Sequence, residues 1–207
     1  MCACAHYSGI LKGVEDLRSP SSFYSKRVPI TISMLEDLNR GFDRSSGLDI
    51  RVQANCLLSV FCQLHSDELL PPTQNLEKFN PHWHATFAKI AESTAANSTC
   101  NLHLPWSNMQ KAWGDDVWIP RQEAPLDPIH ATHKNFIKNR LDINHPIAAY
   151  RDAHNNIVTL TCSKFVRCVN EILRATRKGY PHISGHCFCI RGTTFYLVSG
   201  IPPDMVK

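Results

Sequence analysis

Residues 184–207 read SGHCFCIRGTTFYLVSGIPPDMVK, and they are the most informative stretch of the chain. We expect a helix from about His186 to Ser199, with Gly200 as the residue that ends it. His186 and Cys189 fall in the first turn of that helix. Histidine and cysteine carry proton transfer and bind metals, so this helix is the first place to look for a functional site.

The composition is that of a globular protein with free thiols. Hydrophobic residues make up 43% and charged residues 19% of the 207 residues, which suits one sizeable core. No apolar run reaches the roughly 18 residues of a membrane span, and the first residues lack the features of a secretory signal. Nine cysteines at irregular spacing argue against a disulfide scaffold. We expect a soluble intracellular protein of the nucleus or cytoplasm, with no membrane partner.

Helical signals recur along the chain. A capping box at Ser33 opens a first helix. The segment 49–64 is apolar on nearly all sides, which is typical of a central core helix. Asp127 followed by Pro128 predicts another helix start, and 163–178 is strongly amphipathic.

Two short β-hairpins are expected between these helices. One pairs 101–106 with 117–120 across a polar loop, and the other pairs 147–150 with 157–159. Together with the helices they predict an α+β, mainly helical fold.

Positive charge concentrates between residues 134 and 178. This region holds nine Lys and Arg against three Asp and Glu, a net charge of +6. An excess of that size can bind a phosphate backbone. A solvated helix face is the alternative interpretation of the same charges. The side chains that we expect to contact DNA are Lys164, Arg167, Arg174 and Arg177.

The closing stretch resembles the final motif of tyrosine recombinases, the phage-integrase-like enzymes that break and rejoin DNA, in the form carried by fungal mobile elements. The resemblance implies that 29–207 is a truncated catalytic domain whose last, tyrosine-bearing helix would follow Lys207. It further implies that 1–28 is a linker and the remnant of a helical core-binding domain. Members of the family also oligomerise on DNA.

The family's chemistry implies roles for particular positions. Two arginines clamp the phosphate, histidines assist proton transfer, and a lysine on a hairpin tip protonates the leaving oxygen. The segment CQLHSDELLPP, residues 62–72, resembles the first arginine motif but carries His65 in the arginine position. In the closing motif His186 is retained, and Cys189 stands in the second arginine position.

The hairpin lysine is also replaced. In LHLPWSNMQK, residues 102–111, its position holds Asn108, and Lys111 on the same loop is a candidate substitute. The resemblance therefore implies a DNA-binding relative that has lost strand cleavage. The alternative is an active site-specific recombinase that needs a missing C-terminal segment.

The pattern of replacements suggests decay. Arginine codons become histidine or cysteine codons by C-to-T change at CG dinucleotides. His65, Cys162, Cys168 and Cys189 all stand where the family or the helix pattern accepts arginine. We interpret the chain as a decayed mobile-element copy.

A zinc-binding protein is the competing hypothesis, because cysteine and histidine are abundant. The candidate ligands are Cys2, Cys4, His6, His82, His84, His182, His186, Cys187 and Cys189. None shows the C-x2-C spacing of a structural zinc module, and the H-x3-H pair of His182 and His186 has no such cysteine pair to complete it. Cys187 and Cys189 would also point in different directions from one helix. We therefore expect no metal and no cofactor.

Overall fold

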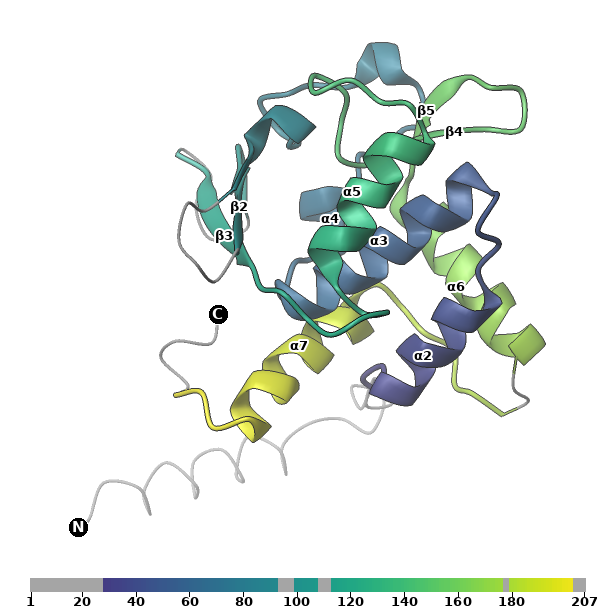
Figure 1. Cartoon of the computed structure of the whole chain (residues 1–207), viewed down its shortest axis with the longest axis vertical. Coiled ribbons are helices and arrows are strands. Elements are labelled where there is room, and N and C mark those ends of the chain that lie inside the picture. The colour runs from purple at the N-terminus through teal and green to yellow at the C-terminus, as the bar shows by residue number, and fades with distance from the viewer. Residues whose placement is uncertain (1–27, 93–98, 108–112, 177–178, 203–207) are drawn as a thin grey trace, which may run out of the picture.

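The computed structural model describes residues 28–92, 99–107, 113–176 and 179–202. Its central element is helix α3 (Gly47–Phe61), which begins where the Ser46 hydroxyl accepts a hydrogen bond from the Asp49 amide. Every residue from Ile50 to Phe61 is buried, which confirms the predicted core helix. Figure 1 shows α3 running through the middle of the molecule.

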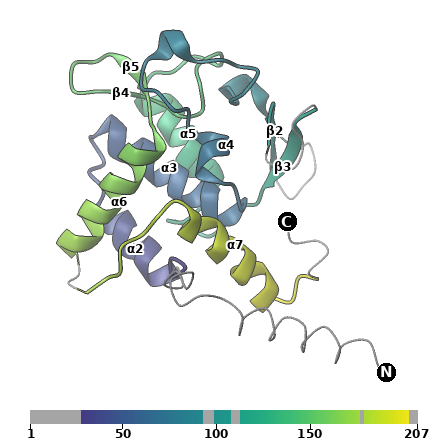
Figure 2. The same ribbon diagram turned by 180° about the vertical axis from the view of Figure 1, so that it is seen from behind.

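Four other helices of ten or more residues surround α3. They are α2 (Ile32–Gly41), α5 (Pro128–Lys138), α6 (Cys162–Thr176) and α7 (His186–Val198). Helices α5 and α7 pack directly on α3, whereas α2 packs mainly on α6, as both views show (Figures 1 and 2). The short helix α4 (Ser66–Leu69) follows α3. No helix of the described segments is long and apolar enough to cross a membrane.

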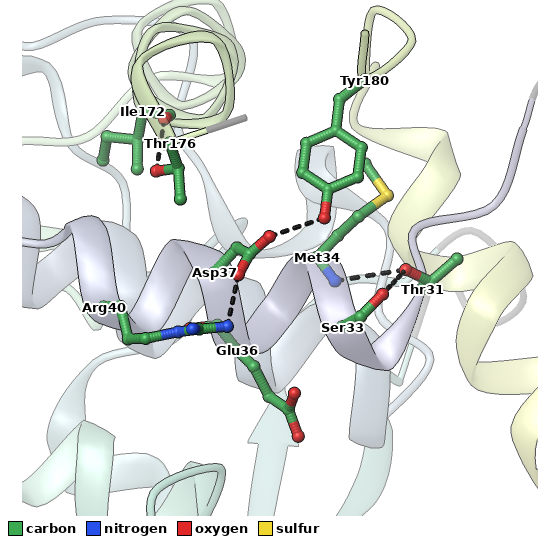
Figure 3. Close-up of polar contacts among 9 residues, drawn as sticks. All are labelled: Thr31, Ser33, Met34, Glu36, Asp37, Arg40, Ile172, Thr176 and Tyr180. Carbon is green, nitrogen blue, oxygen red and sulfur yellow. Dashed lines mark hydrogen bonds and ion pairs between the residues drawn. The ribbon is translucent and has the colours of Figure 1, made fainter. Parts of the chain in front are cut away.

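Helix α2 begins earlier than its predicted cap. The Thr31 hydroxyl, and not that of Ser33, accepts the hydrogen bond from the Met34 amide, at 3.1 Å, and Ser33 bonds to Thr31 instead (Figure 3). The reason lies one residue upstream, where the Ile30 amide donates to the Cys187 carbonyl. That contact keeps the chain extended up to Thr31, which then becomes the first residue able to cap the helix.

Two other sequence signals are confirmed. The Asp127 carboxylate accepts from the Ile129 amide at 2.9 Å, and Pro128 is the first helical residue of α5. Ser199 ends α7, and Gly200 follows at a φ of 83°, the left-handed conformation that glycine adopts without cost.

The strands form two small antiparallel sheets. Strands β2 (Cys100–Leu104) and β3 (Asp115–Ile119) form the first predicted hairpin, and β4 (Ala149–Arg151) with β5 (Ile157–Thr159) forms the second. An additional strand, β1 (Ile90–Glu92), pairs with β2. Two single 3-10 turns, η2 (Leu76–Lys78) and η3 (Phe87–Lys89), precede it. The sequence did not predict β1.

A buried arginine ties α3 to the second hairpin. Arg51 is fully buried, and its guanidinium donates to the Ile147 carbonyl and to the Asn55 side chain. Burial lowers the pKa of Arg51 to about 9. Because a buried cation is costly unless hydrogen bonded, these two contacts fix the chain that leads into β4 against the core helix.

Helix α7 lies unusually close to the end of α3. A Cβ atom added to Gly192 would sit 2.1 Å from the Val60 carbonyl oxygen, which no real Cβ could do without moving a backbone. Gly192 therefore sets the distance between the two helices. It is buried in the middle of α7 and not at a turn, so it serves close packing and not conformational freedom.

Because of this contact, we expect Gly192→Ala to change the free energy of unfolding in the direction opposite to that given by helix propensity. Alanine in place of glycine inside a helix normally stabilises by about 1 kcal/mol. We expect Gly192→Ala instead to lower the free energy of unfolding by about 1–3 kcal/mol, the usual cost of overpacking. Denaturant titration measures the change. Val198→Ala, at a position 82% exposed on the same helix, should change stability by less than about 0.5 kcal/mol. A Gly192→Ala variant as stable as the wild type would refute the close contact.

Candidate functional site

The end of α3 turns sharply into a short loop that carries His65. Gln63 adopts a φ of 56°, a left-handed conformation that reverses the chain directly after the helix. The Glu68 carboxylate then accepts a hydrogen bond from the His65 amide at 2.8 Å. Glu68 is itself buried, so the backbone of His65 is held against α4.

The start of α7 is positioned from the opposite side. The Asn170 side chain, on α6, donates to the Ile183 carbonyl at 2.7 Å and accepts from the Ile183 amide at 2.9 Å. Gly185 then passes so close to Ser66 that a Cβ would lie 2.5 Å from its hydroxyl. These contacts bring the first turn of α7 beside the loop that carries His65.

Three side chains meet at this point. The Sγ atom of Cys189 lies 3.3 Å from Nδ1 of His186 and 3.9 Å from Nδ1 of His65. The two imidazole rings stack, with centroids 5.4 Å apart and planes inclined by 27°. We call His65, His186 and Cys189 the His-His-Cys cluster. Two of its members are 124 residues apart in sequence, so only the fold brings them together.

The local electrostatics keep the thiol neutral. Burial is the main cause that raises the pKa of Cys189, and the Glu68 carboxylate adds to it. The thiol also donates to the His186 carbonyl at 3.2 Å. The positive charge of Arg191 does not offset the raised pKa of Cys189, because the Arg191 guanidinium lies over the Phe195 ring, 5.9 Å from its centroid.

An open pocket of about 280 Å³ lies over the cluster. Its lining residues come from the loop after α3 and from α7: Gln63, His65, His186, Cys189, Ile190, Thr193 and Thr194. The Thr193 hydroxyl donates to the Gln63 side chain at 3.1 Å and so links α7 to the loop after α3 within this lining. The pocket is open to solvent, and His186 in its lining is exposed.

The other predicted site residues are distributed differently. Asn108, Lys111 and Arg177 lie outside the described residues. The ammonium of Lys164 already has a partner within the protein, because it donates to the Tyr150 hydroxyl at 2.6 Å and lies over the Tyr150 ring. Arg167 and Arg174 are exposed on α6. Arg167 lies 3.9 Å from Glu171, a surface ion pair too weak to hold it.

A second group of cations includes one residue that the sequence analysis overlooked. Lys134 and Lys138 lie on α5 and approach Arg44, which precedes α3. Partial burial lowers the pKa of Lys134, and the like charges of Arg44 and Lys138 lower it further. Like charges held together in this way attract anions. Arg44 was missed because it is 90 positions away from Lys134, outside the basic region of the sequence.

Comparison with known proteins shows a likeness in structure but not in sequence. No family model and no curated protein matches the sequence. A solved FLP recombinase–Holliday junction complex is similar in structure, with a TM-score of 0.52 and 9% sequence identity over 98% of this chain. The chain has a tyrosine-recombinase-like fold. It spans half of the length of that FLP chain, and at this identity the likeness concerns the fold alone.

Tyr196 is the one tyrosine of α7, and its hydroxyl has a structural partner. It donates to the Phe61 carbonyl at the end of α3, and burial raises its pKa to about 12. A tyrosine that acts as a nucleophile must instead present its oxygen to substrate and lose its proton readily. In this tyrosine-recombinase-like domain, Tyr196 fastens α7 to α3.

We expect Tyr196→Phe to reduce the free energy of unfolding by about 1 kcal/mol at neutral pH, because the Phe61 carbonyl loses its donor. The pKa of Tyr196 is higher in the folded state than the usual value of about 10. Its contribution is therefore complete below pH ~10 and is lost as the pH rises towards about 12. The stability difference between wild type and variant should shrink over that range in denaturant titrations. A difference independent of pH, or no difference at all, would contradict this role.

Proposed function

We propose that this chain is a DNA-binding relative of tyrosine recombinases that no longer cleaves DNA. One observation carries the proposal. The His-His-Cys cluster consists of the three residues whose sequence motifs resemble the two arginine positions and the histidine of the catalytic site. These residues meet in one pocket of a domain with a tyrosine-recombinase-like fold.

The chemistry of the cluster supports the loss of cleavage. Phosphoryl transfer through phosphotyrosine needs permanent cations that grip two oxygens of the phosphate at once. A neutral imidazole offers a single donor, and the neutral thiol of Cys189 offers a weak one. Tyr196 is held by Phe61, and the side chains that line the described pocket include no tyrosine.

The proposed DNA contacts lie on α6 and α5. Arg167 and Arg174 extend from the exposed face of α6. Arg44, Lys134 and Lys138 form a second group of positive charges near the start of α3. FLP recombinase was solved with a Holliday junction, which makes DNA the partner to test first. The assignment to the fungal mobile-element type, and the history of decay, rest on the motif resemblance at residues 62–72 and 184–207.

We expect sequence-independent DNA binding that weakens steeply with salt. The logarithm of the association constant should fall with the logarithm of salt concentration by about 0.9 for each phosphate contact. Arg167→Ala with Arg174→Ala should make that slope shallower by up to about 1.8. Fluorescence anisotropy with a labelled duplex between ~50 and ~200 mM salt measures both slopes.

Lys78→Ala provides the matched control, because Lys78 is exposed on η2, outside the basic region. Its slope should equal that of the wild type. Binding that is absent at ~50 mM salt or insensitive up to ~200 mM would exclude the proposed DNA contacts.

We also expect no covalent protein–DNA adduct. Incubation with nicked suicide substrates, followed by a denaturing gel, should show free protein only, because the cluster provides neither a phosphate clamp nor an available nucleophile. An adduct that survives boiling, and that Tyr196→Phe leaves intact, would show that another tyrosine of this chain attacks DNA. Either form of adduct would refute the loss of cleavage.

A further inference from the structure

The His-His-Cys cluster has the composition of a metal site. Its two imidazoles and one thiol are the ligand types that zinc prefers, whereas magnesium and calcium prefer oxygen. All three ligand atoms lie within 4.8 Å of one another with no ion present. His186 and Cys189 were candidate zinc ligands in the sequence. His65 was not, because zinc motifs are recognised from ligands a few residues apart and His65 is far from α7 in sequence.

The distances fit tetrahedral coordination. Bonds of about 2.3 Å to sulfur and 2.0 Å to nitrogen, at tetrahedral angles, place sulfur about 3.5 Å from each nitrogen. The observed separations of 3.3 Å and 3.9 Å lie on either side of that value. Both histidines approach Cys189 with the same ring atom, Nδ1. Rotation of these side chains would bring their ligand atoms, which all lie within 4.8 Å of one another, to bonding distance of one ion.

We propose that His65, His186 and Cys189 bind one Zn²⁺ ion and leave its fourth coordination position open to the pocket. Three protein ligands with one exposed position is the arrangement of zinc sites that accept water or another exchangeable ligand. Metal binding deprotonates the thiol, and the ion supplies the positive charge that the buried sulfur lacks. This inference rests on the cluster alone and does not depend on DNA binding.

The surroundings give the site rigidity. The Glu68 carboxylate holds the backbone of His65, and Asn170 fixes the segment before α7. Gly192 sets the distance between the two helices that carry the ligands. Cys187 is excluded as a ligand, because its sulfur contacts Ser184 and lies away from the histidines in the core.

The test uses Co²⁺, which replaces zinc and gives a near-ultraviolet charge-transfer band when a thiolate binds it. Cys2, Cys4 and His6 also offer ligands in sequence, so the parent protein is the full chain with Cys2→Ser and Cys4→Ser. After metal is stripped under non-chelating reductant, we expect this parent to bind one equivalent of Co²⁺ with the thiolate band, and Zn²⁺ to abolish the band.

Adding Cys189→Ser to the parent should abolish the thiolate band. Adding His65→Gln or His186→Gln should weaken Co²⁺ binding at least about 10-fold, because even the loss of a residue that only hydrogen-bonds to a metal ligand costs that much. Adding Cys187→Ser instead should leave the band unchanged. Circular dichroism establishes that each variant folds. Absence of the band in the folded parent, or its persistence in the folded Cys189→Ser variant, would overturn the proposal. DNA binding measured on the same samples separates this outcome from a failure of the proposed function.

Discussion

The close approach of α7 to α3 at Gly192 is the constraint on which the rest of the structure depends. Because no side chain separates Gly192 from the Val60 carbonyl, the start of α7 lies beside the loop after α3. Tyr196 and Thr193 then bridge the two segments through Phe61 and Gln63. The same packing brings His186 and Cys189 to His65, so the pocket is a consequence of how two helices meet.

Much of the fold could be predicted because its signals are local. The apolar segment that became α3, the Asp127-Pro128 helix start and both hairpins depend on neighbouring residues, and all are present in the structure. The start of α2 was misplaced because a contact from Ile30 to the distant Cys187 decides it. Motif resemblance identified the three cluster residues one by one, but their mutual distances depend on the fold. The sequence offered His186 and Cys189 as candidate zinc ligands, but the proposed metal site also needs His65, which only the fold brings to them.

The cluster residues can be explained either by decay of a recombinase site or by retention as a metal site. Under the proposed relationship to tyrosine recombinases, His65 and Cys189 stand where arginines would supply the cations that a phosphate clamp needs. Together with His186 they place a thiol and two imidazoles within reach of one ion. Decay alone gives no reason for three metal-binding side chains within 4.8 Å of one another, whereas retention as a metal site does. In both cases the same scaffold of α3, α6 and α7 positions the three residues.

The most direct test of the central claim is to return both arginines. If the pocket is the former phosphate site of a recombinase-like domain, His65→Arg with Cys189→Arg places two guanidinium groups where a phosphate fits. The double variant should bind DNA more tightly than the wild type, with a salt slope steeper by about 0.9 for each guanidinium that contacts a phosphate. Ala153→Arg with His154→Arg, on the exposed β4–β5 turn, adds charge away from the pocket as a control. Equal gains in the two double variants would contradict the assignment of the site.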